Sequence, residues 1–237
     1  MELWHQTLAR LPWEWAQYGF MHNALLAVLL VSPLYAFLGT MVVGNRMVFF
    51  SDVLGHSALT GLALGVLLGL ADPVWAMAGF AMLLVVAIAL FQKHTRAGHD
   101  TVLGVFFAVV VALGVVLLSR QGGIGKYSSY LVGDILTVTP GQLGGLALLF
   151  LVAGAFWTLA GNPLYLVSLS PSLARSRRIP VFLVETAFAL LLALVVMLSL
   201  RLVGLLIINS LLILPAAAAR LLARDVKGYT GGAVGIS

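Results

Sequence analysis

Seven stretches of about 20 mostly apolar residues follow one another along this chain of 237 residues. A helix needs roughly 20 apolar residues to cross the ~30 Å hydrocarbon core of a bilayer, so each stretch is long enough to span it. The spacing predicts membrane-spanning helices at about 20–44, 50–71, 74–92, 101–119, 142–160, 181–200 and 202–222. We therefore expect an all-α fold, a polytopic transmembrane bundle of about seven helices that forms a single domain over residues 1–237.

The composition agrees with lipid as the solvent and excludes several kinds of chemistry. Only 9% of the residues are charged, whereas soluble domains carry about 25%. There is no cysteine, which excludes disulfides and thiolate metal sites. The sequence contains no Walker-type phosphate loop, no Gly-x-Ser-x-Gly nucleophile elbow and no His-Glu-x-x-His zinc motif. We therefore expect no enzymatic activity in this chain, and any ATP hydrolysis would belong to a partner.

The distribution of lysine and arginine among the loops predicts the orientation. One alternating set of loops holds nine of the thirteen basic residues and the opposite set holds four. The basic side of a membrane protein is normally cytoplasmic. The amino terminus is therefore expected outside, and the chain should end inside after seven spans.

Two segments outside the spans are expected to fold at the membrane surface. Residues 1–19 contain Trp4, Trp13 and Trp15. Tryptophan prefers the headgroup region, which favours an interfacial helix over a frayed terminus. Residues 121–139 are too polar and too rich in glycine to span, so we expect a folded outer loop or a partial re-entrant segment there.

Asp52 and His56 are ionisable residues inside the second span, where such residues are costly and usually functional. Their spacing of four places both on one face of a helix, one turn apart. A carboxylate oxygen and an imidazole nitrogen suit Zn²⁺ or Mn²⁺ better than Mg²⁺ or Ca²⁺. On spacing alone, the two side chains could instead pair with each other or be solvated near the interface.

Other polar residues are weaker candidates. Asn209 lies in the middle of the last span, where it could hydrogen-bond between helices or line a pathway. Asp134, in the outer segment, is a second pathway candidate. Glu185 lies near the expected cytoplasmic start of its span and could face Arg177 or Arg178.

A cytoplasmic loop is expected at residues 161–180, between breaks at Asn162-Pro163 and Pro180. Ser170 and Pro171 fit the cap and first position of a short helix with a basic end. The loop could be no more than a basic cytoplasmic loop, or it could dock a cytoplasmic partner. Its candidate contact residues are Ser170, Pro171, Leu173, Ala174 and Arg175.

Several motifs in order resemble the membrane-spanning subunit of ATP-binding-cassette importers for zinc, manganese and related divalent metals. The first motif begins with an arginine and holds the Asp52–His56 pair, and the segment Ser-Leu-Ser-Pro-Ser-Leu-Ala-Arg resembles the family's coupling loop. The matching stretches are residues 44–65, 100–108, 130–139, 168–175 and 203–220.

The resemblance implies a multi-pass permease of the bacterial cytoplasmic membrane. Two copies would pair around a central pathway, with no nucleic acid involved. Two copies of a separate ATPase would dock chiefly at residues 168–178 and would hold the ATP. An extracytoplasmic metal-binding protein would deliver the cation to the outer face.

The resemblance also implies that Asp52 and His56 coordinate the transported metal within the membrane. Zn²⁺ or Mn²⁺ would then pass as cargo, and no permanently bound cofactor is expected. Leu59-Thr60-Gly61 favours zinc, because manganese members often carry a proline before this glycine.

The carboxyl end departs from the family pattern, because members usually continue into a further span. We therefore expect the eighth span to be missing, through truncation or in a native short form. The residues alone also allow an ion-coupled secondary transporter that uses Asp52 and His56 as a proton relay, or a structural subunit that transports nothing.

Overall fold

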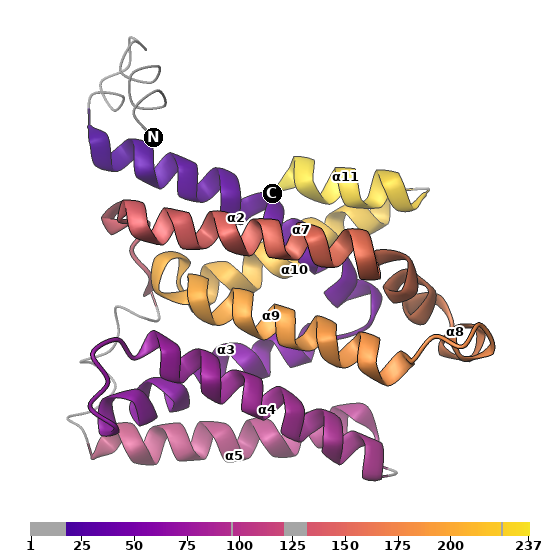
Figure 1. Cartoon of the computed structure of the whole chain (residues 1–237), viewed down its shortest axis with the longest axis horizontal. Helices are drawn as coiled ribbons and strands as arrows, with labels where there is room; N and C mark the ends of the chain where they lie inside the picture. Colours follow the sequence, from indigo (N-terminus) through magenta and orange to yellow (C-terminus); the bar gives the residue numbers. More distant parts are fainter. Residues whose placement is uncertain (1–17, 96, 121–131, 224) are drawn as a thin grey trace.

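The structure, a computed structural model, describes residues 18–95, 97–120, 132–223 and 225–237 (Figure 1). All the regular elements in these ranges are helices. They are α2 (Gly19–Gly44), α3 (Val48–Leu67), α4 (Val74–His94), α5 (His99–Ser119), the 3₁₀ helix η3 (Ile135–Thr137), α7 (Pro140–Leu169), α8 (Pro171–Ser176), α9 (Val181–Val203), α10 (Leu205–Leu222) and α11 (Val226–Ile236).

Seven of the described helices are long and apolar enough to cross a membrane, namely α2, α3, α4, α5, α7, α9 and α10. The expected all-α bundle of about seven spans is therefore confirmed, and each helix overlaps its predicted range. The expected interfacial segment 1–19 lies outside the described residues except for its last two. Residues 121–131 of the expected outer segment also lie outside them.

The fifth span is longer than predicted. Helix α7 continues through Pro163 and ends at Leu169 after 30 residues. The predicted break at Asn162-Pro163 is therefore wrong, and only the part of residues 161–180 after Leu169 lies outside this helix. Proline is tolerated inside transmembrane helices because neighbouring groups or local adjustments can satisfy the backbone carbonyl that it leaves free.

Helix α3 is the inner helix of one half of the bundle. It packs against α4 and α5 and also contacts α2, α9 and α10 (Figure 1). Buried small residues, among them Ser57, Ala58 and Ala63, line these contacts. The Thr60 hydroxyl donates a hydrogen bond of 2.7 Å to the carbonyl of Val110 in α5. The small residues of the second span therefore serve close helix packing, as residues of this kind commonly do in membranes.

A polar contact joins α10 to α2 near their carboxyl ends. Arg220 Nη1 donates to the carbonyl of Val43 at 3.3 Å. Helix α11 lies beside both helices (Figure 1), and its Tyr229 hydroxyl donates to the carbonyl of Thr40 at 3.1 Å. Because α10 also contacts α3, it connects the α2 side of the bundle to the helix that carries Asp52.

The segment before η3 passes close to the connection between α9 and α10, where Gly133 of the first segment lies against Gly204 of the second. Gly133 and Gly204 have φ values of +75° and +83°, which residues other than glycine rarely adopt. A Cβ atom on Gly204 would also overlap the carbonyl of Val132. The Asp134 amide donates a hydrogen bond of 3.3 Å to the carbonyl of Arg201. Gly204 directly precedes Leu205, so this crossing lies at the start of α10.

Candidate functional site

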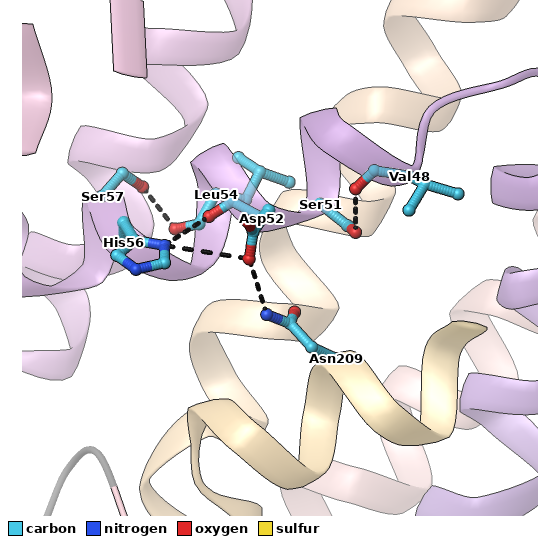
Figure 2. A network of polar contacts seen from close by, with 7 residues as sticks. All are labelled: Val48, Ser51, Asp52, Leu54, His56, Ser57 and Asn209. Carbon is cyan, nitrogen blue, oxygen red and sulfur yellow. Dashed lines mark hydrogen bonds and ion pairs between the residues drawn. The ribbon is translucent and has the colours of Figure 1, made fainter. Parts of the chain in front are cut away.

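Asp52 and His56 lie one turn apart on α3, as the spacing predicted (Figure 2). His56 Nδ1 is 3.0 Å from the backbone carbonyl of Asp52 and 3.9 Å from the carboxylate oxygen Oδ1. A carbonyl only accepts, so in a neutral imidazole the shorter contact assigns the proton to Nδ1 and leaves the lone pair on Nε2. This tautomer is the one that can bind a metal through Nε2.

The two side chains share an open stripe on an otherwise buried stretch of α3. Between Ser51 and Ala63, only Asp52, His56 and Leu59 are not buried. Their spacings of four and three residues place them on one helix face. The Asp52 side chain is 44% exposed and the His56 side chain 35%. The ionisable pair therefore faces away from the packed interior of this single chain.

Asn209 of α10 meets this pair across the bundle. Its amide Nδ2 donates a hydrogen bond of 2.9 Å to Asp52 Oδ1 (Figure 2). The expected hydrogen bond between helices is therefore present, and it places Asn209 at the candidate site. The amide oxygen Oδ1 is buried and has no hydrogen-bond partner within the described residues.

Gly55 of α3 leaves room for the Leu205 side chain of α10 at this point. A Cβ atom on Gly55 would overlap the Leu205 side chain and would lie 3.9 Å from Asn209 Oδ1. Leu205 and Asn209 are four residues apart and so share a face of α10. Nothing in the sequence of the second span signalled the contact between Gly55 and Leu205.

Phe107 of α5 supports the imidazole. The Phe107 and His56 rings meet edge to face, with centroids 5.1 Å apart and an interplanar angle of 78°. Sequence reasoning did not single out Phe107, although it lies in the motif 100–108. An aromatic wall on one side of the ring restricts the directions from which a cation can reach Nε2.

The chemistry of these groups suits a transient divalent cation. A carboxylate and an imidazole are ligands that Zn²⁺ and Mn²⁺ accept. No group of three or more His, Asp or Glu side chains within the described ranges is placed to hold a metal. The chain therefore offers the Asp52–His56 pair, with the Asn209 amide beside it.

Asp134 occupies a different environment from the pair on α3. Its carboxylate accepts a hydrogen bond of 3.1 Å from the Leu136 amide and so caps η3. Its own amide donates to the carbonyl of Arg201, in the last turn of α9. With these two hydrogen bonds, Asp134 stabilises η3 and attaches this segment to the end of α9.

The expected short helix after the fifth span is present as α8. Ser170 Oγ accepts a hydrogen bond of 3.4 Å from the Leu173 amide, and Pro171 is the first helical residue. Ala174 is fully buried among Val167 and Val181, whereas Leu173 is 46% exposed. Ala174 therefore anchors α8, and Leu173 is free to meet another molecule.

A cavity of about 880 Å³ opens beside α8, between the ends of several spans. Arg175 and Glu185 both line it, together with Arg46 and Lys93. The charge of Arg175 acts on Glu185, whereas Arg177 or Arg178 was expected to do so.

Comparisons with known proteins agree with this architecture. The chain is 34% identical to the high-affinity zinc uptake system membrane protein ZnuB of Haemophilus influenzae, over 89% of this chain and 81% of that protein. It is 28% identical to the manganese transport system membrane protein MntC of Halalkalibacterium halodurans, over 86% of this chain and 70% of that protein.

A solved structure, PsaBC from Streptococcus pneumoniae in complex with Fab, shares the fold with a TM-score of 0.78. The alignment covers 99% of this chain and 82% of the other at 23% identity. The profile of the ABC 3 transport family matches residues 17–237. This chain is therefore a membrane permease that belongs to the ABC 3 transport family.

Proposed function

We propose that this chain is the membrane-spanning subunit of an importer that moves a divalent transition metal into the cytoplasm by alternating access. The observation that carries the proposal is the Asp52–His56 pair, which lies on the open stripe of the inner helix α3. Ionised aspartate and neutral histidine would hold the cation while its exposure changes from one side of the membrane to the other.

The open stripe supports a pathway between two copies of the chain. An ionisable side chain in contact with lipid is strongly unfavourable, and such residues normally face a bundle interior or a water-filled path. Asp52 and His56 are partly exposed in the single chain. A second copy that covers this stripe would remove the pair from lipid and would bring further ligands to the cation.

Energy would come from a separate pair of ATPase subunits on the cytoplasmic face. Helix α8 supports this proposal, because it is capped, anchored by the buried Ala174, and presents Leu173 outward. ATP binding by the partner would move α8 and, through α7 and α9, rock the spans. The chain itself would hydrolyse nothing, and an extracytoplasmic binding protein would deliver the metal in a bacterial cytoplasmic membrane.

We favour zinc over manganese as the cargo. The chain is 34% identical to the zinc uptake protein and 28% identical to the manganese protein described above. The stretch Leu59-Thr60-Gly61 also lacks a proline before the glycine, and in this respect it resembles the zinc members of the family more than the manganese members.

Metal uptake in cells that express the chain with its ATPase tests the proposal. His56→Ala should abolish uptake of Zn²⁺ at unchanged abundance in the membrane. His94→Ala is the matched control, because His94 Nδ1 makes the same contact with the carbonyl four residues earlier, here Leu90 at 2.8 Å. Equal uptake by the His56 variant would place the site elsewhere. Uptake by the chain alone in liposomes without ATP would favour an ion-coupled transporter.

A further inference from the structure

Asn209 uses only half of its amide in the contact with Asp52. Nδ2 donates to Asp52 Oδ1 at 2.9 Å, and the carbonyl oxygen Oδ1 is left buried without a partner among the residues that the structure describes. A buried carbonyl that makes no hydrogen bond is unfavourable and calls for an explanation. A role in joining α3 to α10 explains the hydrogen bond of the amide nitrogen. It does not explain why the amide oxygen is buried without a partner.

The packing of α10 on α3 keeps this amide at the candidate site. Gly55 provides the space for Leu205, and Asn209 Oδ1 lies 3.9 Å from the position of a Cβ on Gly55. The amide therefore lies over the turn of α3 that carries both Asp52 and His56 (Figure 2). The amide nitrogen faces the carboxylate in this arrangement, and the amide oxygen is a neutral donor atom close to it.

We infer that Asn209 is a ligand of the transported cation, which it binds through Oδ1 after the hydrogen bond to Asp52 is exchanged for the metal. This inference rests on the proposed metal transport. A half-turn about the Cβ–Cγ bond interchanges the amide nitrogen and oxygen and brings Oδ1 to the side of Asp52. Neighbouring oxygens on an octahedral cation such as Mn²⁺, at about 2.1–2.2 Å from the ion, lie roughly 3 Å apart. The present separation of 2.9 Å between Asn209 Nδ2 and Asp52 Oδ1 matches that spacing.

A carbonyl ligand has a specific consequence for metal preference. Carbonyl and carboxylate oxygens suit Mn²⁺, whereas imidazole suits Zn²⁺. The loss of Oδ1 should therefore weaken Mn²⁺ binding more than Zn²⁺ binding. A residue that only positions α10 or orients Asp52 should affect both metals alike.

The test measures Mn²⁺ and Zn²⁺ binding by the full-length chain in lipid nanodiscs, with Mn²⁺ followed by electron paramagnetic resonance and Zn²⁺ by competition. Asn209→Ala should lower Mn²⁺ affinity about tenfold and Zn²⁺ affinity by less than about threefold. Asn209→Asp keeps an oxygen at this position and should hold Mn²⁺ affinity within about threefold of wild type. Ser210→Ala is the control, because the Ser210 hydroxyl bonds the Leu206 carbonyl of its own helix and no other group among the described residues.

The possible outcomes separate the two proposals. Selective loss of Mn²⁺ in Asn209→Ala, with recovery in Asn209→Asp, supports Asn209 as a ligand. Equal loss of both metals without recovery, or unchanged binding in Asn209→Ala, overturns it. If His56→Ala binds both metals as wild type does, the proposed transport site itself is wrong.

Discussion

Gly61 of α3 and Met77 of α4 meet backbone to backbone, because a Cβ atom on Gly61 would lie only 2.6 Å from the Cα atom of Met77. Side-chain flexibility cannot relieve a contact with a backbone atom. Helix α3 therefore depends on this glycine for its distance from α4. The same helix carries Asp52 and His56, so the contact also influences where the candidate site lies within the bundle.

Gly61→Ala should lower the melting temperature of the purified chain in detergent. An added methyl group must push α3 and α4 apart, and overpacking of this kind typically costs about 1–3 kcal/mol. Gly79→Ala in α4 is the matched control, because a Cβ there would contact nothing within 4 Å and alanine favours a helix over glycine. Equal melting temperatures for wild type and the Gly61 variant would contradict the close contact.

Leu173→Glu should weaken co-purification of the chain with its ATPase while leaving the fold intact. Leu173 is 46% exposed on α8, and a charge on that apolar contact would oppose docking. Leu136→Glu in η3 is the control, because Leu136 is 49% exposed in a separate segment. Retention of the ATPase by the Leu173 variant, or its loss with the Leu136 variant, would remove α8 from the proposed interface.

The sequence predicted the spans well because the length of an apolar stretch is a direct consequence of bilayer thickness. It also placed Asp52 and His56 on one face, since that relation depends only on helical periodicity. The prediction that the helix ends at Pro163 was wrong. Within a membrane helix, neighbouring groups can satisfy the backbone carbonyl that a proline leaves without a hydrogen bond, so the helix can continue. Residues 161–169 consequently belong to α7.

The contacts around the candidate site could not be predicted from the sequence of any single span. Asp52 and Asn209 are 157 residues apart, and no periodicity within either span specifies which faces meet. The same holds for Phe107 against His56 and for Leu205 against Gly55. Polarity alone identified Asn209 as unusual, whereas its partner became known only from the way α10 packs on α3.

Binding of Zn²⁺ should decrease as the pH falls from about 7 to about 5, because protons compete with the cation for the imidazole and the carboxylate. Equilibrium binding to the purified chain measures this directly. His94→Ala should follow the wild-type pH profile, because His94 lies at the exposed end of α4. Binding that is unchanged at about pH 5 would show that Asp52 and His56 do not form the site.

Gly204→Ala should reduce both stability and metal binding, because Gly204 directly precedes the first residue of α10. Its φ of +83° is unfavourable for alanine, and a Cβ there would overlap the Val132 carbonyl. A shift at this turn should be transmitted to Asn209, five residues further along α10, and weaken its bond to Asp52. Thermal unfolding and Mn²⁺ binding measure the two effects, with Gly141→Ala as the control, since a Cβ on Gly141 would contact nothing within 4 Å. A stable Gly204 variant with wild-type binding would show that α10 does not depend on this crossing.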